Sequence, residues 1–109
     1  MTKTLRVDTK PITRAFQKLR KHGYFAEKNW YCCQTCAVDA VPEENAEKYV
    51  VYCGGYDAEC LKESGSTFLS WAGDDKFICD TLKEAGLKVD HDGSTKRRIW
   101  ITLPNSTVN

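Results

Sequence analysis

The residues best suited to chemistry are three cysteines that fall within the short segment 29–36. Cys33 and Cys36 have the spacing of a zinc-ligand pair, and Cys32 or Cys53 could supply a third thiolate. A structural zinc ion normally takes four ligands from two separated pairs, and the chain offers no second pair of this kind. Zinc therefore stands as a hypothesis for this segment, with Cys33, Cys36 and Cys53 as candidate ligands.

Two other interpretations of the same cysteines stay open. A C-x-x-C pair at a helix start favours the thiolate, which would suit redox chemistry. A thioredoxin-like site would also need a strand just before the pair, where this sequence predicts a helix and a loop. Alternatively, the cysteines pack as small apolar side chains beneath a sheet. Because residues 1–25 lack a secretory signal, we expect reduced thiols rather than a disulfide framework.

The segment Asp90-His91-Asp92 is the best candidate for acid–base catalysis. A histidine base needs a carboxylate that orients its ring. Neighbouring residues on a strand point to opposite faces, so neither aspartate necessarily meets His91. The serines at residues 64–70 have no histidine nearby, and no glycine-rich phosphate loop is present. We therefore predict that the protein is not an enzyme.

Charge is unevenly distributed, although the net charge is only +1. Residues 1–28 hold eight Lys or Arg and two acids, whereas residues 29–95 hold five and thirteen. A basic face and an acidic face are therefore expected, and they could steer a charged partner over about 8–10 Å. The basic stripe of helix 11–22 keeps nucleic-acid binding as an alternative, but the acidic middle of the chain disfavours that partner.

Large aromatic and basic side chains supply the candidate binding residues. Tryptophan is favoured at binding hot spots, so Trp30, Trp71 and Trp100 are candidate anchors, with core packing as the competing interpretation. The predicted binding set is Trp30, Gln34, Tyr52, Trp71, Arg97 and Arg98.

Length and composition limit the architecture. The 109 residues form one domain, 1–109, with loose ends expected at 1–9 and 105–109. The chain is 41% hydrophobic and 28% charged, which allows a packed core and disfavours disorder. No apolar stretch is long enough to span a membrane, so we expect a cytoplasmic protein.

Apolar periodicity and turn residues predict eight main elements. Helices are expected at 11–22, 31–41, 58–64 and 75–85, and strands at 49–53, 67–71, 87–90 and 98–103. Strands 67–71 and 87–90 are joined through a helix, which fits a right-handed crossover. The predicted fold is an α+β two-layer sandwich in which helices cover one face of a mixed sheet of about four strands.

Register in the last hairpin follows from hydrophobic matching. A two-residue turn at Asp92-Gly93 would set Val89 opposite Lys96, which mixes apolar and charged neighbours. A five-residue loop at 92–96 instead sets Val89 opposite Ile99 and makes one side uniformly apolar. We therefore predict the longer loop.

The chain resembles a family of small bacterial proteins known as a domain of unknown function. The resemblance covers about residues 12–101, and its most specific part is the Asn-x-x-Cys-Cys-Gln-x-Cys element at 29–36. It implies a compact cytosolic α+β domain and no established reaction. The family pattern has His followed by Gln-Asp after the first strand, where this chain has Cys53-Gly54-Gly55-Tyr56-Asp57. A cysteine there keeps a metal-ligand type, and it equally suits a half-buried position.

These observations favour a non-enzymatic interaction or ligand-binding domain. It would act as an inhibitor or regulator, either by covering the surface of a protein partner or by sequestering a small molecule. The first alternative is a zinc- or thiol-centred protein that uses Cys32, Cys33, Cys36 and Cys53. The second is nucleic-acid binding through helix 11–22.

Overall fold

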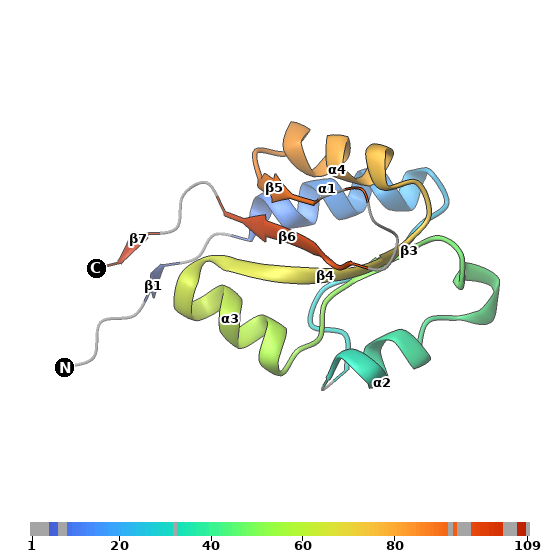
Figure 1. Ribbon diagram of the computed structural model, residues 1–109, viewed down its shortest axis with the longest axis horizontal. Coiled ribbons are helices and arrows are strands. Elements are labelled where there is room, and N and C mark those ends of the chain that lie inside the picture. The colour runs from blue at the N-terminus through green and yellow to red at the C-terminus, as the bar shows by residue number, and fades with distance from the viewer. Residues whose placement is uncertain are drawn as a thin grey trace.

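The computed structural model describes residues 5–6, 9–31, 33–91, 93, 97–103 and 107–108, arranged as Figure 1 shows. The elements are β1 Leu5–Arg6, α1 Lys10–Lys21, β2 Phe25–Glu27, α2 Gln34–Asp39, a 3-10 helix Glu43–Asn45, β3 Tyr49–Val51, α3 Tyr56–Ser64, β4 Ser66–Ala72, α4 Asp75–Glu84, β5 Lys88–Asp90, β6 Ile99–Thr102 and β7 Thr107–Val108. Each predicted helix and strand is present, with ends that differ by a few residues.

The main sheet has five strands in the order β2-β3-β4-β6-β5. β2 and β3 are parallel, and the other neighbouring pairs are antiparallel. A mixed sheet with four α-helices confirms the predicted α+β class. β4 and β5 run parallel with β6 between them, as the predicted crossover requires.

β2 is a fifth strand that the sequence did not predict. Its three residues, Phe-Ala-Glu, include no β-branched side chain, so the local strand signal is weak. The strand forms through long-range pairing instead: Phe25 N–H donates to the Lys48 carbonyl at 3.0 Å, and the pairing with β3 continues from there. The Arg20 Nε–H donates to the Ala26 carbonyl at 2.8 Å and so covers part of this sheet edge.

The predicted register of the last hairpin is wrong by two residues. Val89 lies opposite Ile101 rather than Ile99, and Asp90 lies opposite Trp100. A shift of two residues keeps every side chain on its face, so hydrophobic matching alone does not separate the two pairings. Most of the connecting loop, residues 92 and 94–96, lies outside the described residues.

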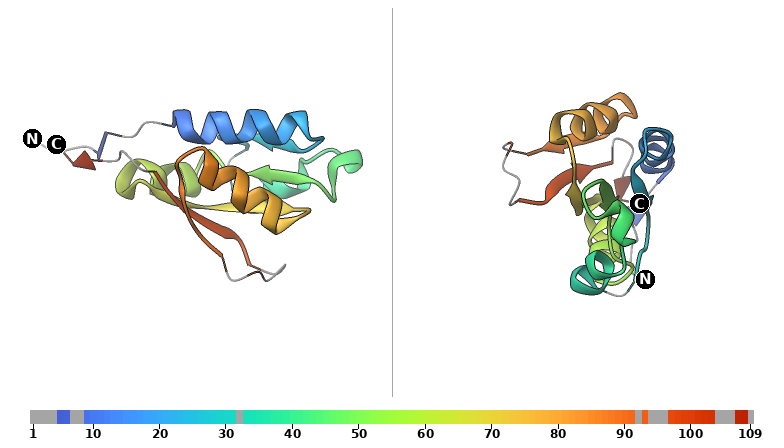
Figure 2. Two further views of the ribbon diagram at one scale, coloured as in Figure 1. Left: turned by 90° about the horizontal axis from the view of Figure 1, so that it is seen from above. Right: turned by 90° about the vertical axis from the view of Figure 1, so that its right-hand side faces the viewer.

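One face of the sheet carries the larger core. α1 and α4 lie side by side over this face, as Figure 2 shows, and contribute Ile12, Phe16, Leu19, Ile78 and Leu82. The strands contribute Val50, Leu69, Ile99 and Ile101, all of them 0% exposed. Ile99 and Ile101 alternate along β6, whereas in β3 the consecutive residues Val50 and Val51 are both buried, as expected for a strand covered on both faces.

The opposite side of the sheet is covered at its β2–β3 end. Ala37 and Val41, within and just after α2, pack with Val51 and Cys53, and with the partly buried Phe25. α3 packs against β4, and Figure 1 shows α2 and α3 on the side away from α1 and α4. Helices therefore lie on both sides of the sheet, whereas the sequence predicted one covered face.

α2 is shorter than the predicted helix 31–41 for a reason that lies outside the helix. Trp30 N–H donates to the Tyr52 carbonyl at 2.8 Å, and Gly54 N–H donates to the Tyr31 carbonyl at 2.7 Å. These bonds hold residues 30–31 beside the end of β3, with Tyr31 at a φ of +62°. A helix can begin only after this segment.

The chain ends meet in a second, two-stranded sheet. β1 pairs antiparallel with β7, so that Leu5 lies opposite Val108 and Arg6 opposite Thr107. We expected loose ends at 1–9 and 105–109, and much of both stretches lies outside the described residues. Among the residues described, no helix has the length and apolar character needed to cross a membrane.

Candidate functional site

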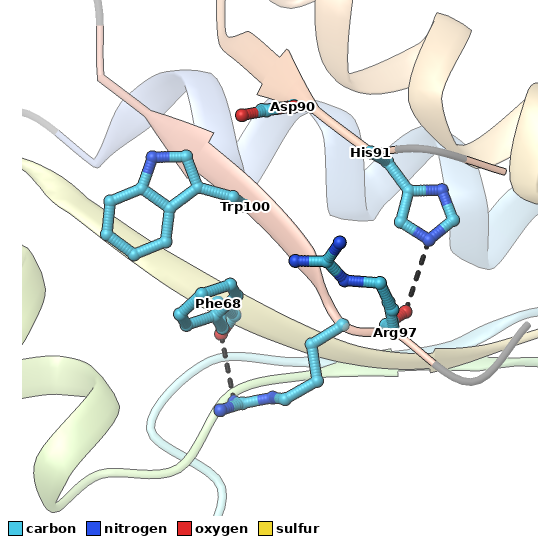
Figure 3. Close-up of a pocket in the computed structure, with 6 residues that line it drawn as sticks. Phe68, Asp90, His91, Arg97 and Trp100 are labelled. Atoms are coloured by element: carbon cyan, nitrogen blue, oxygen red, sulfur yellow. Dashed lines mark hydrogen bonds between the residues drawn. The ribbon is translucent and has the colours of Figure 1, made fainter. Parts of the chain in front are cut away.

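A cleft of about 420 Å³ opens on the second face of the sheet, over β4, β6 and the end of β5. Its lining, as far as the described residues show it, combines two aromatic rings, two arginines, a histidine and an aspartate: Phe68, Asp90, His91, Arg97, Arg98 and Trp100. Figure 3 shows how these side chains lie. The volume falls within the range of small-molecule sites, about 300–1,000 Å³.

Three lining residues form one row across the sheet. Phe68 of β4 lies directly opposite Trp100 of β6, and Trp100 lies directly opposite Asp90 of β5. The two rings meet edge to face, with centroids 4.6 Å apart. Phe68 is 39% exposed and Trp100 is partly buried, so the rings offer apolar surface to the cleft.

A buried ion pair fixes one wall of the cleft. The Arg98 Nη2–H donates to Asp57 Oδ2 at 2.5 Å and to the Phe68 carbonyl at 3.1 Å. The Asp57 side chain is only 4% exposed, and Asp57 Oδ2 also accepts from the Cys53 N–H at 3.2 Å. The guanidinium of Arg98 lies 5.5 Å from the Phe68 ring centroid, which adds a cation–π contact. Arg98 therefore links α3, β4 and β6 at the cleft.

The other arginine of the cleft is held through its main chain. The Arg97 carbonyl accepts from Trp71 Nε1–H at 2.8 Å and from His91 Nε2 at 3.1 Å. Because a carbonyl can only accept, His91 Nε2 carries a proton, and Gly93 N–H donates to His91 Nδ1 at 3.3 Å. Asp75 Oδ2 lies 3.8 Å from the same Nδ1. In Figure 3 the Arg97 guanidinium extends over β6 toward the rings of Trp100 and Phe68.

The acid–base groups among the described lining residues are His91 and Asp90. The His91 side chain is 2% exposed, and both of its ring nitrogens contact main-chain groups. Among the described lining residues, none carries a nucleophilic hydroxyl, thiol or amine. The edge-to-face rings of Phe68 and Trp100 share the cleft with the guanidinium of Arg97 and the carboxylate of Asp90.

The structure brings three of the six predicted binding residues to this cleft and leaves three elsewhere. Arg97 and Arg98 line it, and Trp71 supports it from behind through the Arg97 carbonyl. Tyr52 is 2% exposed in the main core, where burial raises its pKa to about 12. Trp30 packs against the buried cluster of Ala37, Val41, Val51 and Cys53, and its buried Nε1–H has no hydrogen-bond partner among the described residues. The side chain of Gln34 lies outside the described residues.

Sequence reasoning missed Phe68 and Asp57 as members of the site, and it considered Asp90 only as an acid–base partner of His91. Phe68 had a detectable signal, because the alternation of strand 66–72 places it on the face opposite Leu69. Asp57 belongs to the site through its ion pair with Arg98, 41 residues later, and Asp90 through its strand pairing with Trp100, 10 residues later. A local sequence pattern does not reveal such pairings.

The candidate metal ligands are spread between the surface and the core. Cys33 and Cys36 are exposed at the start of α2, whereas Cys53 is 1% exposed and its sulfur accepts the Asp57 N–H at 3.5 Å. Cys32 lies outside the described residues. Within the described residues, no group of three or more His, Cys, Asp or Glu side chains is placed to hold a metal ion.

The basic stripe of α1 is partly neutralised. Lys18 forms an ion pair with Glu84 of α4 at 2.5 Å, and neighbouring Arg20 forms one with Glu27 at 3.3 Å. Arg14 remains exposed on the same helix, which lies on the side of the sheet away from the cleft.

A shallower cleft of about 400 Å³ lies beside the end of α1. Its walls include Tyr24, Lys48 and Phe77. Lys48 is engaged within it, since its ammonium donates to the His22 carbonyl at 2.9 Å and lies 4.8 Å from the Tyr24 ring centroid. The Tyr24 hydroxyl accepts the Asp74 N–H at 3.0 Å, so the polar groups of this cleft largely bind one another.

Comparison with known proteins identifies a family. Searches of curated proteins and of solved structures gave no match. The sequence profile of one protein family, described as Domain of unknown function (DUF6891), matches residues 4–105, which is nearly the whole chain. The chain therefore belongs to the DUF6891 family.

Proposed function

We propose that this protein is a non-enzymatic binding domain and that the cleft over β4, β6 and β5 is its ligand site. One observation carries the proposal: the Arg97 cation and the Phe68–Trp100 ring pair face the same small cavity. Planar apolar surface beside an arginine is the usual chemistry for holding a flat, anionic molecule.

The support of the lining residues strengthens this proposal. Arg98 is locked by Asp57 and the Phe68 carbonyl, and the main chain of Arg97 is held by two donors. A site whose walls are fixed before the ligand arrives loses less entropy on binding. Of the two modes considered from the sequence, a concave cavity of this size favours capture of a small molecule over coverage of a protein surface. We place this activity in the cytoplasm, where exposed cysteines stay reduced.

Binding of simple probes tests the proposal. Benzoate, phenyl phosphate and adenosine monophosphate each combine a ring with an anion, and isothermal titration calorimetry would measure their affinity. We expect at least one probe to bind, and the substitutions Arg97→Ala and Trp100→Ala to weaken it. Arg14→Ala, an exposed arginine on the other side of the sheet, is the matched control and should change nothing. Absence of binding by every probe, or binding that ignores both cleft substitutions, would rule out this site.

A further inference from the structure

The two edges of the main sheet differ in how they are protected. At the β2 edge, Arg20 donates from Nε to the Ala26 carbonyl at 2.8 Å and forms an ion pair with Glu27 at 3.3 Å. β5 forms the opposite edge, and within the part of the chain that the structure describes it pairs only with β6. The outer main-chain groups of an edge strand can pair with a further strand. The β5 edge is therefore a candidate interface.

β5 carries two opposite charges that find no partner among the described residues. Lys88 and Asp90 are both exposed, and because they lie two residues apart their side chains share one face of the sheet. Their neighbours across the strand pair are Thr102 and Trp100, which carry no charge. Neither side chain forms a hydrogen bond or an ion pair with another described residue. A lysine and an aspartate are thus displayed together at the edge.

The order of these charges makes the edge complementary to itself. A two-fold axis perpendicular to the sheet keeps α1 and α4 of both copies on the same side. Centred on Val89, this axis sets Lys88 of each copy opposite Asp90 of the other, whereas a centre at Lys88 or at Asp90 sets like charges opposite each other. Edge charges of a single sign would repel a second copy in every register. Opposite signs two residues apart instead allow one register and disfavour its neighbours.

We propose that a second copy of this chain pairs antiparallel with β5 in the register centred on Val89. The occupant is a second copy because the charges of the strand complement themselves. Val89 packs on the main core and stays partly exposed. At the centre of the pairing it meets Val89 of the second copy, and β-branched pairs of this kind stabilise sheets. The two sheets then form one continuous sheet.

The second copy also adds a side chain to the cleft. Phe68, Trp100 and Asp90 form one row across β4, β6 and β5, and the Asp90 side chain lines the cleft. Lys88 of the second copy extends this row on the far side of Asp90. The dimer therefore places a lysine beside the cleft that a single copy does not place there. This pairing does not depend on which ligand the cleft binds.

Analytical ultracentrifugation of the 12.4 kDa chain tests the pairing. A three-residue edge gives a small interface, so we expect a reversible dimer with a Kd of about 1 mM or tighter. Lys88→Asp or Asp90→Lys alone changes both symmetric pairs from attraction to repulsion and should weaken the dimer at least about 4-fold. Exchanging the two charges, Lys88→Asp with Asp90→Lys, restores the complementarity and should return the Kd close to that of the wild type.

A matched control and the fold of each variant complete this test. Lys62→Asp makes the same charge change at an exposed position of α3 and should leave the Kd unchanged. Far-UV circular dichroism would confirm that each variant is folded. A wild-type chain that stays monomeric at about 1 mM would overturn the inference. A dimer that the single reversals leave intact, or that the charge exchange fails to restore, would form through another surface and would overturn it equally.

Carbodiimide cross-linking checks the register directly, because this reagent joins an ammonium to a carboxylate only when the two groups are in contact. In a mixture of isotope-labelled and unlabelled protein, we expect Lys88 of one form to be joined to Asp90 of the other. A dimer that lacks this mixed cross-link would contradict the register centred on Val89. Failure of the pairing leaves the proposed function standing, since the ligand titrations test the cleft of each copy separately.

Discussion

The substitution Arg98→Met tests whether the buried ion pair holds the cleft together. Methionine keeps the unbranched stem of the side chain and removes the guanidinium. The change deletes the donors to Asp57 and to the Phe68 carbonyl. Asp57, 4% exposed, then keeps a buried carboxylate whose remaining donor is the Cys53 N–H at 3.2 Å. A buried charge with so little compensation is strongly unfavourable.

The size of the effect follows from this geometry. Removing one partner of a buried ion pair costs about 3–5 kcal/mol. Arg98 is 22% exposed, so water reaches part of the site and the lower end of the range applies, about 3 kcal/mol. For a domain of about 100 residues this corresponds to a fall in Tm of about 12 °C or more. The variant should still fold, because native domains are stable by about 5–15 kcal/mol.

Urea unfolding followed by tryptophan fluorescence measures the loss, and two variants control it. Arg14→Met makes the same change at an exposed arginine of α1 and should cost less than about 1 kcal/mol. The double variant Asp57→Asn with Arg98→Met replaces the buried charge by a neutral amide and should recover at least about 1 kcal/mol. Equal losses in the two methionine variants, or no recovery in the double variant, would refute the argument that Arg98 acts by compensating Asp57.

Four other substitutions are tested by urea unfolding. Gly73→Ala would place a Cβ 2.7 Å from the Tyr24 ring at a φ of +126°, so we expect a loss of about 2–3 kcal/mol. Gly93→Ala, at a φ of +86° with its nearest neighbour at 3.8 Å, should lose only about 1 kcal/mol, and an equal loss would contradict the clash. Burial raises the pKa of Tyr52 to about 12, so the unfolded chain ionises first and stability should fall by about 2–3 kcal/mol between pH 10 and 12. Tyr52→Phe should reduce that fall. Lys18→Ala removes an exposed ion pair and should change stability by less than about 0.5 kcal/mol, whereas a larger loss would show that the pair stabilises the α1–α4 contact.

Local patterns predicted most of the elements because the core residues repeat with helical or strand periods. Ile12, Phe16 and Leu19 form the buried stripe of α1, and Ile99 and Ile101 alternate inward along β6. Local patterns failed for segments whose conformation is determined by hydrogen bonds to residues far away in the sequence. β2 is held by pairing with β3, and the start of α2 is delayed by the bonds from Trp30 and to Tyr31.

The candidate site was predictable only in part, for a similar reason. Arg97 and Arg98 drew attention as basic residues at the start of a strand, and the structure places both at the cleft. Their different roles could not be read from the sequence, because the partner of Arg98 is a carboxylate 41 residues earlier. The cysteines drew equal attention through their spacing, yet Cys53 is enclosed with Ala37, Val41 and Val51 while Cys33 and Cys36 face outward.

The second face of β4, β6 and β5 departs from maximal burial, as do the exposed Tyr31 and Tyr56 elsewhere. A chain of about 100 residues has little apolar surface to spare, and its large rings are expected inside. Here Phe68 stays 39% exposed beside a partly buried Trp100, while the charged Asp57 is enclosed to hold an arginine at the same cleft. The exposed ring of Phe68 and the buried charge of Asp57 each lower stability relative to a fully packed apolar arrangement, and both lie at the same cleft. The binding site that we propose would account for both features together, because a site whose walls are already fixed loses less entropy on binding.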